Sequence, residues 1–255
     1  MAGPVQSIER AAAILRLLAG GPRRLGLGEV AASLGLAKGT AHGILRTLQH
    51  VDFVEQDAAT GKYQLGAALL HLGTSYLDVN ELRSRSLNWA DALAARSGEA
   101  VRLGTPLEGR VLVVHHVFRP DDTFQTLEVG ALLPLHASSL GKVLLAFGTA
   151  TPGPDGERGL EAYTPHTLVD PDRLARALAT VRETGWAAEI QEMNMGEAGL
   201  AVPIRGHGGL VVGALGLSGP VERICDARCQ PRPALLSLLR EAARAISRDL
   251  GAARW

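Results

Sequence analysis

The residues best suited to recognising another molecule are grouped early in the chain, between Lys38 and Thr47. Lysine and arginine contact phosphate or guanine, and threonine and histidine bond to base edges or backbone. The chain of 255 residues balances 26 basic against 26 acidic side chains, so a DNA-binding surface must be a local concentration of basic groups. No acidic residue falls between Lys38 and His50. The residues expected to contact DNA are Lys38, Gly39, Thr40, His42, Gly43, Arg46 and Thr47, with Lys62 from a later hairpin.

The elements that must position these residues follow from apolar spacing and turn signals. Apolar residues three and four apart predict a helix over 5–20, with Ser7 as its cap, and a short helix over 28–34. Gly35 breaks the pattern before a third helix over 38–50, as the turn of a helix-turn-helix requires. Two short strands, over 53–57 and 62–65, follow as a hairpin. Residues 1–65 are therefore predicted to be a winged helix-turn-helix domain.

The remainder predicts a connector and a larger domain. Residues 66–80 are apolar with few charges, which predicts a linker helix that packs against a partner. Residues 81–255 are predicted to form one domain in which strands come in hairpin-like pairs with helices between them. The pattern is typical of an α+β fold with a mostly antiparallel sheet covered by helices. Expected strands span 100–104, 110–117, 124–129, 186–190, 199–205 and 210–218; expected helices span 81–98, 138–148, 171–185 and 231–250, with a Pro/Gly loop over 149–156.

A second candidate site lies at the start of the helix predicted from Ser138. Ser138 or Ser139 can cap that helix, which leaves backbone N–H groups of its first turn free to bind a carboxylate or phosphate. Lys142 or a neighbouring arginine would add positive charge. The alternative is a plain helix cap with His136 packed in the core.

Several functions are not expected. The start of the chain has no charged segment before an apolar run, and no apolar stretch approaches twenty residues, so we expect a cytoplasmic protein without a membrane span. Two cysteines are too few for a disulfide framework or a zinc site, and neither a cofactor nor a metal is expected. No Gly-x-Ser-x-Gly surrounds His136 and Ser138, so an enzyme is not expected. A small-molecule hydrolase or transferase, and a protein-docking first domain, stay as alternatives.

Several segments, in order, resemble the isocitrate lyase regulator (IclR) family of transcriptional regulators. The segments that carry the resemblance are Val5–Ala11, Leu34–Leu48, Tyr63–Gly66, Pro134–Ala146, Gly185–Glu192 with Gly196 and Pro203, and Ser218–Pro220. The resemblance implies a winged helix-turn-helix, a dimerising linker helix and a GAF-like effector-binding domain. It also implies double-stranded operator DNA as partner, a homodimer or tetramer, and a small effector. Ser75–Val79 and His115–Asp122 most resemble the glycerol operon regulators of actinobacteria. That closer resemblance implies a repressor released by a small anionic metabolite, glycerol 3-phosphate.

The resemblance also implies where the effector binds. The family's ligand positions fall on Ser139, Leu140, Glu189, Gly199, Gly216 and Ser218, and His136, Ser138, Gly141 and Glu192 complete the expected site. Glu189 stands where many members have Asp, and Gly199 and Gly216 replace hydrogen-bonding residues. Leu140 is bulkier than usual. These departures argue against a small keto acid and leave room for a phosphorylated polyol, whose hydroxyls Glu189 or Glu192 would bond.

Overall fold

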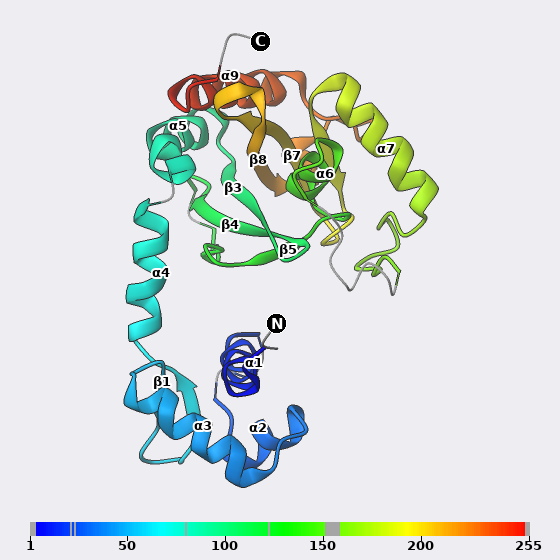
Figure 1. Ribbon diagram of the computed structural model, residues 1–255. Helices are drawn as coiled ribbons and strands as arrows, with labels where there is room; N and C mark the ends of the chain where they lie inside the picture. Colours follow the sequence, from blue (N-terminus) through cyan, green and yellow to red (C-terminus); the bar gives the residue numbers. More distant parts are fainter. Residues whose placement is uncertain are drawn as a thin grey trace. The chain divides into compact units, whose positions relative to one another are not determined.

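The computed structural model describes residues 4–20, 22, 24–79, 81–121, 123–150 and 159–252 (Figure 1). Contacts divide the chain into two compact units, Met1–Val79 and Asn80–Trp255. Among the described residues, no helix has both the length and the apolar character needed to cross a bilayer.

The first unit is a small helical domain with a two-stranded hairpin. Its elements are α1 (Gln6–Gly20), α2 (Leu27–Ser33), α3 (Lys38–His50), β1 (Val54–Gln56), β2 (Tyr63–Leu65) and α4 (Ala68–Val79). Its core is built from Ile14 of α1, Val30 of α2 and Leu45 of α3, all fully buried. The prediction that Ser7 caps the first helix is wrong, because α1 begins at Gln6 and Ser7 lies inside it.

The turn between α2 and α3 has the features that its sequence predicts. Gly35 adopts a φ of 63°, a left-handed conformation that glycine enters without a steric penalty. Leu36 N then donates to Ala31 O at 2.9 Å, which closes the end of α2. At the other end of α2, Gly26 N donates to the Glu29 carboxylate at 2.6 Å. Both ends of the short helix are therefore fixed, and α3 starts in a defined direction.

The second unit is an antiparallel sheet with helical cover. Its elements are α5 (Glu81–Ser97), β3 (Ala100–Leu107), β4 (Arg110–Val117), β5 (Leu132–Pro134), α6 (Ser139–Ala146), α7 (Pro171–Thr184), β6 (Ala187–Ile190), β7 (Glu197–Arg205), the short helix η2 (His207–Gly209), β8 (Val211–Pro220), α8 (Val221–Ile224) and α9 (Pro233–Asp249). The strand order is β5-β4-β3-β8-β7-β6, and every pairing in it is antiparallel. The α+β fold predicted from the sequence is confirmed.

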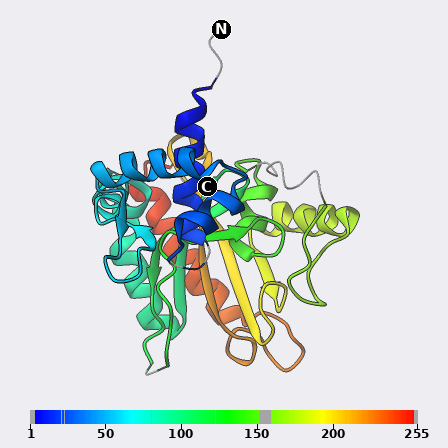
Figure 2. The same ribbon diagram turned by 90° about the horizontal axis from the view of Figure 1, so that it is seen from below.

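Long, paired central strands support the helices and hold them in place. β7 and β8 run side by side along their whole length (Figure 2). α9 packs on β7 and against α5, whereas α6 packs on β7, β8 and α7. Residue 199 of β7 pairs with Ser218 of β8, and Arg102 of β3 pairs with Gly216. These registers bring β3, β7 and β8 together next to the start of α6.

One predicted strand is wrong. Residues 124–129 form no strand, and the edge strand is instead β5. Phe124 is 95% exposed, and Gln125 bonds to Arg119 through its side-chain amide, so this stretch is a loop closed by side chains. The expected Pro/Gly loop over 149–156 lies outside the described residues beyond Ala150.

Candidate functional site

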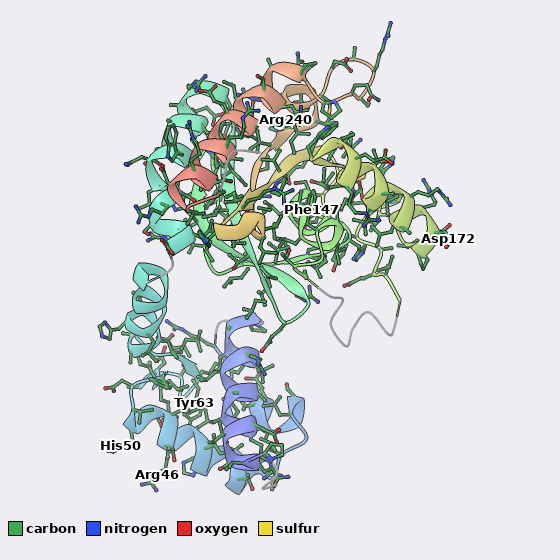
Figure 3. The ribbon with its side chains drawn as sticks, turned by 45° about the horizontal axis from the view of Figure 1, so that its top comes forward. Arg46, His50, Tyr63, Phe147, Asp172 and Arg240 are labelled. Atoms are coloured by element: carbon green, nitrogen blue, oxygen red, sulfur yellow. The ribbon has the colours of Figure 1, made fainter. Side chains whose placement is uncertain are left out.

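The helix α3 has one buried face and one exposed face. Ala41, Leu45 and Leu48 are buried against the rest of the first unit. The opposite face exposes the predicted residues Lys38, Gly39, His42, Gly43, Arg46 and Thr47, whereas Thr40 is half-buried. Arg46 and His50 point outward from the unit (Figure 3). Together with Gly43 and Thr47 they line an open surface depression of about 340 Å³.

Two glycines on this face are not explained by packing. A Cβ added at Gly39 or at Gly43 would meet nothing within 4 Å, and neither residue has a positive φ. Glycine inside a helix costs about 1 kcal/mol relative to alanine. On the exposed face of α3, the backbone is therefore not covered by a side chain at two positions one turn apart. The two glycines lower the stability of the helix, and the packing of the domain does not require them. Such a surface allows a close approach by another molecule.

The hairpin adds basic residues beside α3. Lys62 is exposed, and its Nζ lies 3.9 Å from Glu29 Oε2 of α2. Arg24, which the sequence analysis did not single out, donates to Asp57 at 2.7 Å and to Gln64 at 2.9 Å. Arg24 therefore braces the hairpin through two partners.

A small cavity lies in the second unit where α6 begins, between strands β3, β6, β7 and β8. Its volume is about 10 Å³, enough for roughly one water molecule. The residues that line it are Arg102, Leu133, Ser138, Ser139, Leu140, Glu189, Met193, Gly199, Gly216, Leu217 and Ser218. A ligand of several heavy atoms would have to displace a side chain such as Leu140 or Met193.

Three of the expected effector residues lie outside this lining. His136 Nε2 lies 2.8 Å from Glu161 O, and its ring faces Tyr163. Gly141 packs on the backbone of Leu135, where an added Cβ would lie 2.3 Å from the carbonyl oxygen. Glu192 forms a buried ion pair with Lys142.

Lys142 does not supply the positive charge that its sequence position suggests. Its Nζ is buried, donates to Ala188 O at 3.1 Å and is paired with Glu192 Oε1. The cation that lines the cavity is Arg102, which the sequence analysis missed together with Leu133, Met193 and Leu217. A signal was available, since Arg102 interrupts an otherwise apolar strand between Val101 and Leu103.

Glu189 is the carboxyl group of the cavity. It is 7% exposed, and its Oε1 accepts a hydrogen bond from Met193 N at 3.4 Å. Burial, assisted by the nearby charge of Glu192, raises the pKa of Glu189 to about 7. Near neutral pH this side chain is therefore protonated in a large fraction of molecules, and a protonated carboxyl can donate a hydrogen bond to a ligand oxygen.

The unusual side-chain sizes in the cavity compensate for one another. A Cβ at Gly216 would lie 3.1 Å from Leu140 Cδ2, so the bulky leucine occupies the space that a larger residue 216 would need. A Cβ at Gly199 would lie 2.9 Å from Ser139 Oγ and 3.1 Å from Glu189 Oε2. The hydroxyl of Ser139 and the longer carboxylate therefore fill the position vacated at 199.

The comparisons with known proteins agree across both units. Residues 7–58 match the IclR helix-turn-helix domain, and residues 74–248 match the C-terminal domain of bacterial transcriptional regulator IclR. The chain belongs to the IclR family. It is a DNA-binding transcriptional regulator with a small-molecule effector domain, as the sequence predicted.

Individual relatives match all or nearly all of the chain. It is 55% identical over 255 residues to the glycerol operon regulatory protein of Streptomyces coelicolor, with 100% of both chains covered. The crystal structure of an IclR regulator from Alicyclobacillus acidocaldarius has a TM-score of 0.81 at 29% identity, covering 96% of this chain and 99% of that one. An IclR homologue from Microbacterium hydrocarbonoxydans, solved with 4-hydroxybenzoate, has a TM-score of 0.77 at 25% identity, covering 97% and 100%.

The hydrogen bonds of His136 and Ser138 agree with a regulator rather than a hydrolase. Ser138 Oγ donates to Pro134 O at 2.6 Å and accepts from Gly141 N at 3.1 Å, so it caps α6. His136 is bonded to Glu161 O instead. A serine nucleophile needs a base within hydrogen-bond reach, and these two side chains are engaged with other partners. The matched relatives are also named as regulators and not as enzymes.

Proposed function

We propose that this member of the IclR family represses a glycerol operon and leaves its operator when a small anionic metabolite, glycerol 3-phosphate, occupies the cavity beside α6. The observation that carries the proposal is the 55% identity, over the full length of both chains, to a glycerol operon regulatory protein. The exposed face of α3 and the mixed polar lining of the cavity support the two halves of the mechanism separately.

Operator recognition is assigned to the exposed face of α3. Lys38, Gly39, Thr40 and His42 lie in its first turns, from which a recognition helix reaches base edges in the major groove. Arg46 and Thr47 follow on the same side, and Gly43 lets the helix backbone approach the DNA closely. Lys62, at the hairpin, contacts a DNA phosphate and gives up its 3.9 Å ion pair with Glu29 to do so.

Effector recognition is assigned to the cavity. Ser139 and Ser218 supply hydroxyls, and Glu189 supplies a carboxyl that is in part protonated near neutral pH. A protonated Glu189 donates to a phosphate oxygen, and an ionised Glu189 accepts from a polyol hydroxyl. The cavity therefore suits a ligand that has both kinds of group.

The active form is proposed to be a homodimer or tetramer. Leu70 and Leu72 of α4 are 75% and 51% exposed. They lie two residues apart and therefore on different sides of the helix, so a second copy of α4 would cover one of them. Light scattering on the purified chain tests this, since a monomer at micromolar concentration would contradict it.

The first experiment is a gel-shift titration against the intergenic DNA upstream of the chain's own gene, with and without glycerol 3-phosphate. We expect specific binding that the metabolite abolishes. Arg46→Ala should weaken operator binding by roughly 1–3 kcal/mol, whereas Arg173→Ala, an equal loss of charge on the exposed side of α7, should not. Specific binding that ignores glycerol 3-phosphate would reject that effector, and no specific binding would reject the operator assignment.

The effector half is tested by a second pair of variants in the same assay. Glu189→Ala should keep operator binding and blunt the response to glycerol 3-phosphate. Glu183→Ala, on the exposed side of α7, should leave both unchanged. Normal induction of Glu189→Ala would remove Glu189 from the effector site.

A further inference from the structure

The cation of the cavity is already paired with a carboxylate of the same chain. Arg102 Nη2 donates to Glu128 Oε1 at 2.8 Å, and Arg102 Nε lies in an ion pair with Glu128 Oε2. The pair is largely shielded from water, with side-chain exposures of 17% and 26%. The guanidinium is thus occupied along one edge by a carboxylate of the same chain.

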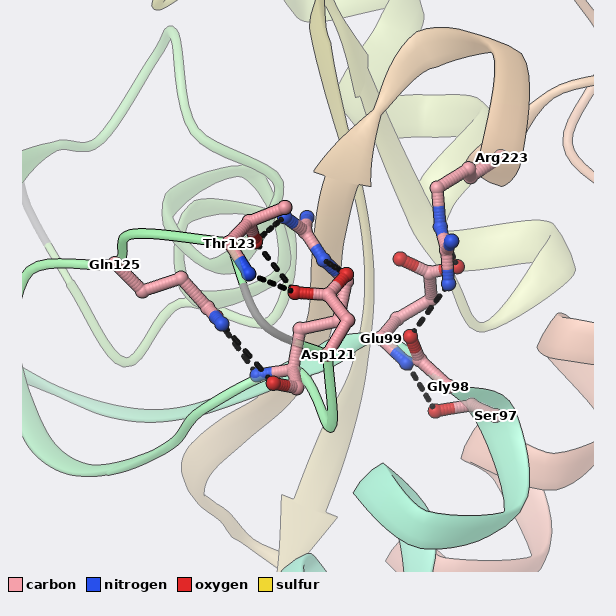
Figure 4. Close-up of polar contacts among 8 residues, drawn as sticks. Ser97, Gly98, Glu99, Asp121, Thr123, Gln125 and Arg223 are labelled. Atoms are coloured by element: carbon pink, nitrogen blue, oxygen red, sulfur yellow. Dashed lines mark hydrogen bonds and ion pairs between the residues drawn. The ribbon is translucent and has the colours of Figure 1, made fainter.

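Glu128 belongs to a segment with few buried anchors. The chain leaves β4 at Val117 and returns to the sheet at Leu132, and between them Phe124 and Leu127 are 95% and 60% exposed. Local polar bonds hold Thr123 and Gln125, as Figure 4 shows. With so few apolar contacts, the side chains of this segment can change rotamer at a low free-energy cost.

The backbone of Glu128 has one further anchor, on β4. Glu128 N donates to His116 Nδ1 at 3.2 Å. Burial lowers the pKa of His116 to about 4, so the ring is neutral near pH 7 and can accept this bond. The backbone of Glu128 is therefore held independently of its carboxylate, which can leave Arg102 while the main chain stays in place.

Charge in the cavity favours an exchange of anions. Among the residues that line it, all of them described, Arg102 is the one cation and Glu189 the one carboxyl. Burial raises the pKa of Glu128, and the positive charge of Arg102 opposes that rise. A carboxylate that pays this desolvation cost regains it by returning to water, provided that another anion takes its place on the guanidinium.

We propose that Arg102 selects an anionic effector by exchanging the Glu128 carboxylate for the anionic group of the ligand. The inference rests on the proposed function in one respect, namely that the cavity beside α6 is the effector site. Phosphate suits the exchange because it presents two oxygens to a guanidinium edge, as a carboxylate does. A neutral polyol has no charge with which to displace Glu128. The pair thus discriminates a phosphorylated polyol from the free polyol.

The test measures binding of inorganic phosphate, glycerol 3-phosphate and glycerol to the full chain by calorimetry. Glu128→Gln removes the competing charge, and we expect phosphate and glycerol 3-phosphate to bind about tenfold tighter than to the unaltered protein. The matched control is Glu241→Gln, which frees Arg96 from a bidentate pair on the surface, with bonds of 2.9 and 3.0 Å. Glu241→Gln should bind phosphate and glycerol 3-phosphate with the same affinity as the unaltered protein. Glycerol should bind no more tightly to Glu128→Gln than to the unaltered protein.

Two substitutions of the cation complete the test. Arg102→Gln should lose phosphate binding, and Arg102→Lys, which keeps the charge but not the paired donors, should retain it in weakened form. Circular dichroism and operator binding show whether each variant is folded. Equal phosphate affinity in the unaltered chain and Glu128→Gln, no phosphate binding by either, or normal binding by folded Arg102→Gln or Arg102→Lys would each overturn the proposal.

The outcome separates this inference from the proposed function. If glycerol 3-phosphate does not release the operator but Glu128→Gln gains phosphate affinity through Arg102, the glycerol effector fails and the anion exchange stands. If glycerol 3-phosphate releases the operator equally well from Arg102→Gln, the regulator stands and the exchange fails.

Discussion

Replacing Glu189 by glutamine should make the effector domain more stable at high pH and change little at low pH. The folded chain holds a proton on Glu189 with a pKa of about 7, against an ordinary value of 4.5. Between these two pH values the folded protein retains a proton that the unfolded chain has lost. The free energy of unfolding therefore falls as pH rises from about 4.5 to above 7. Glutamine carries no charge at any of these pH values and keeps an oxygen for the bond from Met193 N.

The magnitude follows from the two pKa values. A tenfold change in proton affinity is worth about 1.4 kcal/mol, so the difference corresponds to roughly 3 kcal/mol once Glu189 is fully ionised. The side chain is 7% exposed, so water screens little of this cost. At pH 8 the free energy of unfolding of Glu189→Gln should thus exceed that of the unaltered protein by up to about 3 kcal/mol. At pH 5 the two should differ by a small part of that amount.

The assay is urea unfolding followed by tryptophan fluorescence between pH 5 and 8. Trp89 and Trp186 lie in the second unit, and no tryptophan precedes Trp89 in the sequence, so the signal reports the domain that contains Glu189. Other groups titrate in this range, but they are common to both proteins and cancel in the difference. Glu183→Gln, at an exposed position of α7, serves as the matched control. A difference between Glu189→Gln and the unaltered protein that is flat from pH 5 to pH 8 would refute the reasoning.

Three further substitutions test the two sites. Gly43→Ala should stabilise the first unit by up to about 1 kcal/mol, measured by unfolding followed through the helical circular dichroism signal, and should weaken operator binding. The control Gly28→Ala, at an equally uncrowded position of α2, should stabilise the unit without changing operator binding. Unchanged operator affinity in Gly43→Ala would contradict a close approach of the DNA to this helix. Gly199→Ala should keep operator binding in gel shifts but lose the glycerol 3-phosphate response, because its Cβ would crowd Ser139 Oγ and Glu189 Oε2 at 2.9 and 3.1 Å; a normal response would mean that the ligand binds elsewhere. Ser138→Ala should cost about 0.5–2 kcal/mol in urea unfolding through the lost cap of α6, and an unchanged midpoint would show that the cap is dispensable.

The helix-turn-helix was predictable because its determinants are local. The apolar spacing of α2 and α3 and the glycine at position 35 all lie within a few residues of one another, and they fix the turn without help from distant parts. Where local signals were weak, the prediction was wrong. Ser7 has the side chain of a helix cap, but α1 already begins at Gln6. Residues 124–129 were expected to be a strand, yet Phe124 projects into solvent and side-chain bonds hold the loop.

The cavity beside α6 could not be derived from periodicity. Its lining comes from β3, β5, the start of α6, β6, β7 and β8, and only the sheet order brings these segments together. The family resemblance indicated the positions on α6, β6, β7 and β8. It did not indicate Arg102, because a lone arginine in a strand can face either water or the interior. Lys142, the lysine nearest to the expected site in the sequence, instead forms an ion pair with Glu192 and a hydrogen bond to Ala188 O.

The unusual residues of the cavity show why positions should be interpreted in pairs. Taken singly, glycine at 216 removes a hydrogen-bonding group and leucine at 140 adds bulk, so each substitution suggests a different ligand. In the structure the leucine side chain occupies space that a larger residue 216 would need, so the residues at 140 and 216 depend on each other. The same holds for Gly199 with Glu189, since the longer carboxyl reaches across the space beside the glycine. Our proposal therefore rests on the groups that remain polar, namely Ser139, Ser218, Glu189 and a guanidinium that another carboxylate already occupies. We propose that this set favours an anion that carries hydroxyls over a small keto acid.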